Sequence, residues 1–162
     1  MNKALTAAAL ALACAISPVS GAHAAVARMA PNFTWEGPAG ANSLRSLKGQ
    51  PVVLLVAKSA RSRAFRAQVK KLRDVYQEFA GRKVIFAAAI LNGPPDIRTD
   101  IPFVLVPNGA QLAEDFGVND SFNIIIIGRD GNVDYQTSRV LPASRVRDVV
   151  VNSFVEQSQR RK

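Results

Sequence analysis

The hydrophobic pattern of the chain is dominated by three apolar runs: PVVLLVA at 51–57, KVIFAAAIL at 83–91 and NIIII at 123–127. In none of them do apolar and polar residues alternate, as they would in a strand with one face in water. Continuous runs of this length are typical of strands that are buried on both faces. We therefore predict three central strands of one sheet at these positions.

The residues between the first two runs repeat with a helical period. Apolar side chains recur at spacings of four, three, four and three residues, at Phe65, Val69, Leu72, Tyr76 and Phe79. This spacing places them on one stripe of an amphipathic helix, which we expect to end at Gly81. A helix between two buried strands predicts a right-handed βαβ unit whose strands are parallel.

Weaker patterns complete the expected order of elements. We predict a short strand at 32–35, a helical turn at 43–49, an extended segment at 101–107, a brief helix at 109–117, a strand at 133–137 and a C-terminal helix at 142–157. The tight turn GRDGN joins the last two strands as an antiparallel hairpin. The predicted fold class is α/β, a central mixed β-sheet flanked by helices, with a βαβ unit followed by a β-hairpin and a C-terminal helix.

The first 24 residues have the pattern of a secretory signal peptide. Lys3 precedes an apolar core from Ala4 to Ile16, and AHA, ending at Ala24, fits the small-x-small cleavage rule. We predict cleavage after Ala24 and a periplasmic or secreted location. Lipid attachment at Cys14 is a less favoured alternative, because the residue three before it is alanine rather than the usual leucine.

Cleavage there would remove the only cysteine of the chain, Cys14, and its only histidine, His23. The remaining chain could form no disulfide and would offer no thiolate nucleophile, no imidazole base and no histidine ligand for zinc. Beyond the signal peptide we predict an N-terminal segment at 25–50, one domain at 51–157 and a basic tail at 158–162.

Basic residues outnumber acidic ones. The chain has 21 Lys and Arg against 12 Asp and Glu, a net charge of +9, and loss of Lys3 would leave 20 basic residues and a charge of +8. We expect so basic an exported chain to bind an acidic protein, a glycan, a small anion or an anionic membrane surface, rather than nucleic acid.

Several stretches resemble exported thioredoxin-like and peroxiredoxin-like proteins. APNFTWEGPAGANSLRSLKGQPVVLLVA is similar to their opening, A-P-x-F, a glycine-containing turn, S-L-x-x-L-x-G-K and an apolar strand. IPFVLVPNGAQLAEDFGV and IIIIGRDGNV resemble their later half. The similarity covers about residues 30–155 and implies the thioredoxin fold. SFNIIIIGRDG and the terminal RRK are also similar to small, cysteine-free thioredoxin-like domains of unknown function.

The resemblance fails where that family does its chemistry. It places the redox cysteine pair at Ala60 and Arg63, neither of which can form a thiolate. It places the family's cis-proline at Phe122, where we expect a trans bond because a non-proline cis bond costs about 3 kcal/mol. Ser59 and Ser62 are poor nucleophiles without a base. We therefore predict no redox or peroxidase activity and no enzyme, with neither a cofactor nor a metal.

What remains at this position is the start of a helix. A helix N-terminus presents unpaired N–H groups and a partial positive charge, which can hold an anion. We predict Ser59 as the N-cap, with Ser62 as the alternative. The candidate ligand-binding residues are Lys58, Ser59, Arg61, Ser62, Arg63, Arg66 and Phe122.

The sequence allows two interpretations of these candidate residues. The cations either bind an acidic group or cover an ordinary solvated helix face, and Phe122 is either an exposed aromatic in a partner groove or a core residue. The favoured function is a non-redox binding or adaptor protein of the bacterial envelope. The alternatives are a non-thiol enzyme that uses Ser59 or Ser62 on an anionic substrate, and a peripheral membrane-surface protein. The sequence leaves the oligomeric state open.

Overall fold

The computed structural model describes residues 28–38, 40–47 and 49–159, with side chains described as far as Ser153. The predicted signal peptide and its cleavage site lie outside the described residues, as do Cys14, His23 and most of the predicted basic tail.

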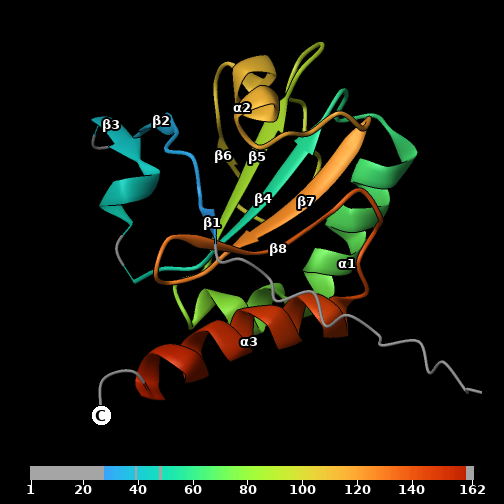
Figure 1. Cartoon of the computed structure of the whole chain (residues 1–162). Coiled ribbons are helices and arrows are strands. Elements are labelled where there is room, and N and C mark those ends of the chain that lie inside the picture. The colour runs from blue at the N-terminus through green and yellow to red at the C-terminus, as the bar shows by residue number, and fades with distance from the viewer. Residues whose placement is uncertain (1–27, 39, 48, 160–162) are drawn as a thin grey trace, which may run out of the picture.

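A six-stranded mixed sheet forms the centre of the protein (Figure 1). In order across the sheet, the strands are β1 (Arg28–Met29), β8 (Asn132–Thr137), β7 (Phe122–Ile127), β4 (Val52–Ala57), β5 (Ile85–Ile90) and β6 (Val104–Leu105). Strand β4 pairs in parallel with β5 and antiparallel with β7, and β7 and β8 form an antiparallel hairpin. These pairings confirm the predicted mixed sheet, the parallel βαβ unit and the hairpin.

Helices cover both faces of this sheet (Figure 1). One face carries α1 (Arg63–Ala80) and α3 (Ala143–Gln159); the other carries α2 (Gly109–Asp115), the hairpin of β2 (Thr34–Gly37) and β3 (Gly40–Ser43), and the short 3-10 helix η1 (Leu44–Ser46). Successive residues of β4 point to opposite faces, so Val53 packs in the core under α1 and α3, whereas Leu54 packs under α2. Both residues are fully buried, which explains the uninterrupted apolar run.

Helix α1 follows its predicted stripe and ends close to the predicted residue. Phe65, Leu72 and Phe79 are buried against the sheet. Gly81 is the C-terminal cap, but its φ of −67° is right-handed, and the left-handed residue is Lys83 with φ 55°. The predicted end of the helix at Gly81 is confirmed, and the left-handed turn comes two residues later.

A buried glutamine joins α1 to the segment that leads into α3. Gln68 is fully buried; its Nε2 donates to the carbonyl oxygen of Leu141 at 3.3 Å, and its Oε1 accepts from the Leu141 N–H at 2.7 Å. The side chain thus satisfies both backbone polar groups of one buried residue. This contact fixes α1 relative to the start of α3.

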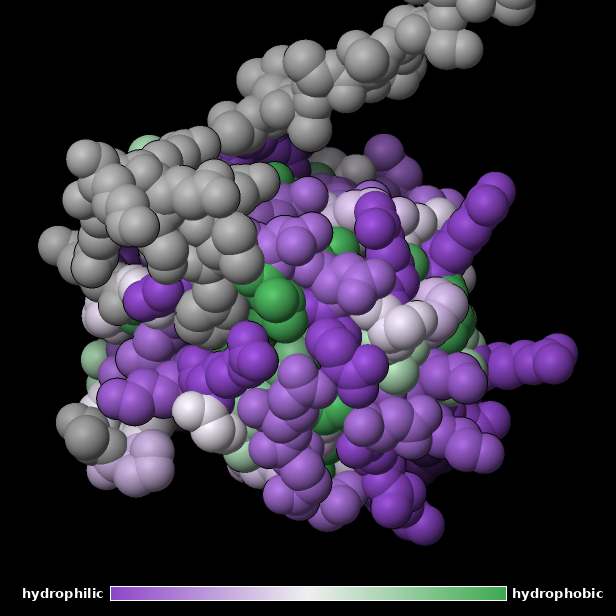
Figure 2. All heavy atoms as spheres, turned by 90° about the horizontal axis from the view of Figure 1, so that it is seen from below, coloured by the Kyte–Doolittle hydropathy of each residue, from purple (hydrophilic) through white to green (hydrophobic). Residues whose placement is uncertain are grey.

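The outer surface of the face that carries α1 and α3 is mainly hydrophilic, with hydrophobic side chains visible only in small areas between the polar ones (Figure 2). In the described part of the chain, no helix has the length and the hydrophobicity that a membrane crossing requires.

Candidate functional site

The loop between β4 and α1 defines where the helix begins. The Oγ of Ser62 accepts a hydrogen bond from the N–H of Phe65 at 3.3 Å, so Ser62 is the N-cap of α1. The prediction of Ser59 as the cap is wrong, because its Oγ instead accepts from the N–H of Arg61 at 3.2 Å, in the turn before the helix. The alternative, Ser62, is confirmed.

The same loop is held by backbone hydrogen bonds to both neighbouring strands. The N–H of Lys58 donates to the carbonyl oxygen of Ser121 at 3.0 Å, just before β7. The carbonyl oxygen of Lys58 accepts from the N–H of Asn92 at 2.9 Å, just after β5. The first turn of α1 therefore lies at a fixed place beside the end of the sheet.

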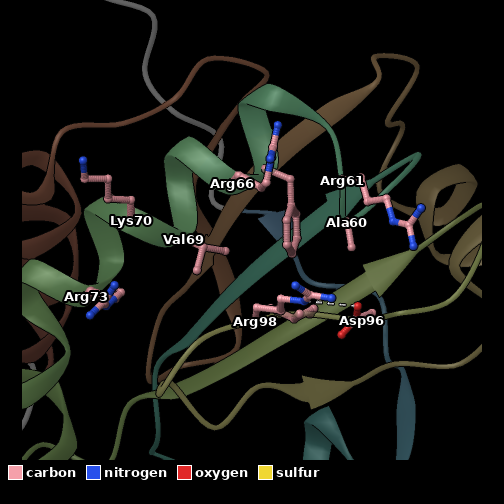
Figure 3. A pocket seen from close by; sticks show the side chains of 10 residues that line it. Ala60, Arg61, Arg66, Val69, Lys70, Arg73, Asp96 and Arg98 are labelled. Atoms are coloured by element: carbon pink, nitrogen blue, oxygen red, sulfur yellow. Dashed lines mark ion pairs between the residues drawn. The ribbon is translucent and has the colours of Figure 1, made fainter.

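A groove of about 540 Å³ lies between α1 and the segment 96–98, which follows β5 (Figure 3). Its lining residues are Ala60, Arg61, Phe65, Arg66, Val69, Lys70, Arg73, Asp96, Ile97 and Arg98. The floor is apolar: Ala60, Phe65 and Val69 are buried, and Ile97 is half-buried against the same core. In Figure 3, Ala60 and Val69 point into the space between the helix and the segment.

Cations line the rim of this groove. Arg61, Arg66, Lys70, Arg73 and Arg98 are all exposed, and Asp96 is the one acidic residue that lines the groove. Figure 3 shows Arg61 and Arg73 toward the two ends, with Arg66 and Lys70 on α1, their charged ends directed away from the floor. The groove therefore combines an apolar floor with a cationic edge.

Two of the five cations are paired within the protein. The Nε of Arg98 lies 3.6 Å from the Oδ2 of Asp96, and the Nε of Arg73 lies 3.1 Å from the Oδ1 of Asp100, which joins α1 to the segment opposite. Among the described residues, no ion pair is formed by Arg61, Arg66 or Lys70. These three cations therefore have no described carboxylate within 4 Å, whereas Arg73 on the same helix does.

The structure brings together only some of the predicted site residues. Arg61 and Arg66 line the groove, whereas Lys58, Ser59, Ser62 and Arg63 do not. All four lie at the same end of α1, with Lys58 and Arg63 exposed and the two serines half-buried.

Phe122 does not belong to the site. It is 2% exposed and packs in the core under α1 and α3, so its interpretation as an exposed aromatic in a partner groove is wrong and the core alternative is confirmed. The described residues contain no cis peptide bond, as expected at this position.

Sequence reasoning missed Lys70, Arg73, Asp96 and Arg98. A signal for the helical part was present, because Arg66, Lys70 and Arg73 are spaced by four and three residues and so lie on one face of the helix. No comparable signal existed for the segment 96–98, since its approach to α1 is a tertiary contact of an irregular loop. Within the described residues, no group of three or more His, Cys, Asp or Glu could hold a metal ion.

No family model matches the chain, and no curated protein matches it. Solved structures do. A DsbE-like thiol:disulfide interchange protein from Chlorobium tepidum matches with a TM-score of 0.64 and 18% identity, over 78% of this chain and 96% of that one. The mitochondrial 2-Cys peroxiredoxin of Plasmodium falciparum matches with a TM-score of 0.63 and 17% identity, over 85% and 98%. An exposed lipoprotein thioredoxin from Streptococcus pneumoniae matches with a TM-score of 0.55 and 17% identity, over 74% and 98%.

The chain has the thioredoxin fold. The predicted fold and the resemblance from which it was inferred are confirmed. The redox cysteines of these thioredoxin-like proteins are lacking, because the chain has a single cysteine, Cys14, outside the described residues. The positions to which the resemblance assigns the pair hold Ala60, which is buried in the groove floor, and Arg63, which is the first residue of α1. At these identities the likeness carries the fold and not the activity.

Proposed function

We propose that this protein is a non-redox binding or adaptor protein of the bacterial envelope, which holds an acidic group of its partner in the groove beside the N-terminal half of α1. The observation that carries this proposal is the position of Arg61, Arg66 and Lys70 along the groove, with no ion pair to any described residue. Neighbouring cations repel one another, and a bound anion would offset that repulsion because it attracts each of them.

The electrostatics of the helix itself support an anionic occupant. The first turn of α1 contains no acidic residue, although a carboxylate there would be stabilised by the partial positive charge of the helix N-terminus. Arg66, which lines the groove, adds further positive charge at this unfavourable place. The planar guanidinium group suits a carboxylate or a phosphate, because it can donate two parallel hydrogen bonds.

The contacts of the two serines favour binding over covalent chemistry. Among the described residues, the Oγ atoms of Ser59 and Ser62 accept hydrogen bonds from backbone N–H groups, and neither is bonded to a side chain that could act as a base. A serine nucleophile normally needs such a base. No observation therefore favours the non-thiol enzyme that the sequence left open.

The envelope location is supported from two sides. The first 24 residues have the pattern of a signal peptide. Extracytoplasmic proteins also occur among the structures that match, such as the exposed lipoprotein thioredoxin. We propose that this chain acts outside the cytoplasm in the same way.

An NMR titration with hexaglutamate tests the proposal. We expect the amide signals of residues 60–73 and 96–98 to shift on addition of the peptide, and the Arg66→Glu/Lys70→Glu variant to lose those shifts. The double variant Arg63→Glu/Lys71→Glu changes the net charge equally on exposed positions of α1 that do not line the groove, and it should keep them. Shifts that survive in the first variant, or that map to another face, would contradict the proposal.

Phosphatidylglycerol vesicles address the membrane alternative. Sedimentation of the protein with these vesicles at low salt, unchanged in the Arg66→Glu/Lys70→Glu variant, would favour a diffuse membrane contact over the groove.

A further inference from the structure

We infer that the groove accepts an extended acidic peptide segment, in which one apolar side chain inserts between α1 and the segment 96–98 while acidic side chains on either side meet the cations of the rim. This inference rests on the proposed function and goes beyond it, because it names the chemical class of the partner and predicts a requirement that charge alone does not impose.

The apolar floor is the first reason. Ala60, Phe65 and Val69 form it from the side of α1, and Ile97 completes it from the opposite wall. A carboxylate placed directly on this surface would lose water without gaining hydrogen bonds, which is unfavourable. An apolar side chain gains from the same contact, since it removes apolar surface from water. The floor therefore suits a ligand that is not acidic throughout.

The spacing of the cations is the second reason. Arg66, Lys70 and Arg73 lie on one face of α1, and the first and last are seven residues apart, about 10 Å at a rise of about 1.5 Å per residue. An extended peptide advances about 3.3 Å per residue, so about three residues cover the same distance. Acidic residues on both sides of a central apolar residue can therefore reach cations at both ends, whereas the single carboxylate of a fatty acid cannot.

The wall opposite α1 carries a carboxylate of the protein itself. Asp96 lines the groove and pairs with Arg98 at 3.6 Å, and both side chains belong to the segment that faces α1. Figure 3 shows this ion pair across the groove from Val69. An incoming acidic side chain would compete with Asp96 for Arg98. Removal of the Asp96 charge should therefore strengthen the binding of an acidic peptide.

Calorimetric titration of the purified protein with capped pentapeptides tests the inference. The probes are Glu-Glu-Leu-Glu-Glu, the same peptide with a central Ser, and Lys-Lys-Leu-Lys-Lys. We expect the Leu peptide to bind about tenfold more tightly than the Ser peptide, the effect of burying most of one leucine side chain, and the lysine peptide not to bind. Ile97→Ser should reduce the preference for Leu several-fold, since it removes one wall of the apolar floor, and Asp96→Asn should tighten the binding of both acidic peptides several-fold.

The outcomes separate this inference from the proposed function. Equal affinities of the Leu and Ser peptides, both lost in Arg66→Glu/Lys70→Glu, would overturn the apolar insertion and leave acidic-group binding intact. No binding of either acidic peptide would overturn both. Tighter binding of decanoate than of the Leu peptide would identify a lipid anion as the ligand class and overturn the peptide inference. Because Ile97 and Asp96 lie in a loop, far-ultraviolet circular dichroism of both variants should match that of the unsubstituted protein.

Discussion

Replacement of Gln68 should destabilise the fold more than any other polar substitution on α1. Gln68 is fully buried and is the only described side chain that hydrogen-bonds the backbone of Leu141, at 2.7 Å to its N–H and 3.3 Å to its carbonyl oxygen. Gln68→Met keeps the length of the side chain but removes both hydrogen bonds. Gln68→Ala also removes most of the buried side-chain volume.

The magnitude follows from these contacts. Each hydrogen bond contributes about 1 kcal/mol net, and a buried backbone group left without a partner costs about 1–3 kcal/mol. We therefore expect Gln68→Met to lower the free energy of unfolding by about 2 kcal/mol. Gln68→Ala should lower it by about 3 kcal/mol, because the lost packing adds to the lost hydrogen bonds. These are large fractions of a typical total of about 5–15 kcal/mol.

Urea denaturation followed by circular dichroism measures these differences. Gln77→Ala is the matched control, since Gln77 is an exposed glutamine on the same helix and its loss should change stability by no more than about 0.5 kcal/mol. If both Gln68 variants also stay within about 0.5 kcal/mol of the unsubstituted protein, the contact between α1 and the segment before α3 does not hold the fold as described.

Two further predictions concern the local structure, one beside the site and one on the opposite face of the sheet. Ser62→Ala should lower the free energy of unfolding by about 1 kcal/mol, because it removes the N-cap of α1. Ser59→Ala should lower it by clearly less. Thermal melts compare the two variants, and equal losses would refute the assignment of the cap. Gly109→Ala should lower the free energy of unfolding by about 1–3 kcal/mol, because a Cβ at this position would lie 2.8 Å from the carbonyl oxygen of Ile90 in β5. An unchanged midpoint of urea denaturation would contradict this and show that α2 can move away from the sheet.

The sequence was sufficient to predict the central fold because the strongest local patterns coincide with the most buried elements. The runs that became β4, β5 and β7 are apolar on both faces, and the stripe from Phe65 to Phe79 faces the sheet as expected. These elements also lie in the order expected from the resemblance to thioredoxin-like proteins.

The site was predicted less completely because it depends on tertiary placement. The choice between Ser59 and Ser62 as the cap depends on where the backbone turns, and both serines are suitable caps by residue type. Phe122 was a candidate only through an alignment to the family's cis-proline, and burial decides its role instead. Asp96 and Arg98 approach α1 through an irregular loop, whose position no periodic pattern specifies.

The most direct test of acidic-group binding in the groove is the dissociation constant of the Glu-Glu-Leu-Glu-Glu peptide for three forms of the protein at one salt concentration. Two exposed charge pairs are together worth about 1–2 kcal/mol. We therefore expect Arg66→Gln/Lys70→Gln to weaken binding by about 5- to 30-fold, and the control Arg63→Gln/Lys71→Gln to weaken it by less than about threefold. Equal weakening in both variants would show that only the net charge of α1 matters, which would contradict a binding site in this groove.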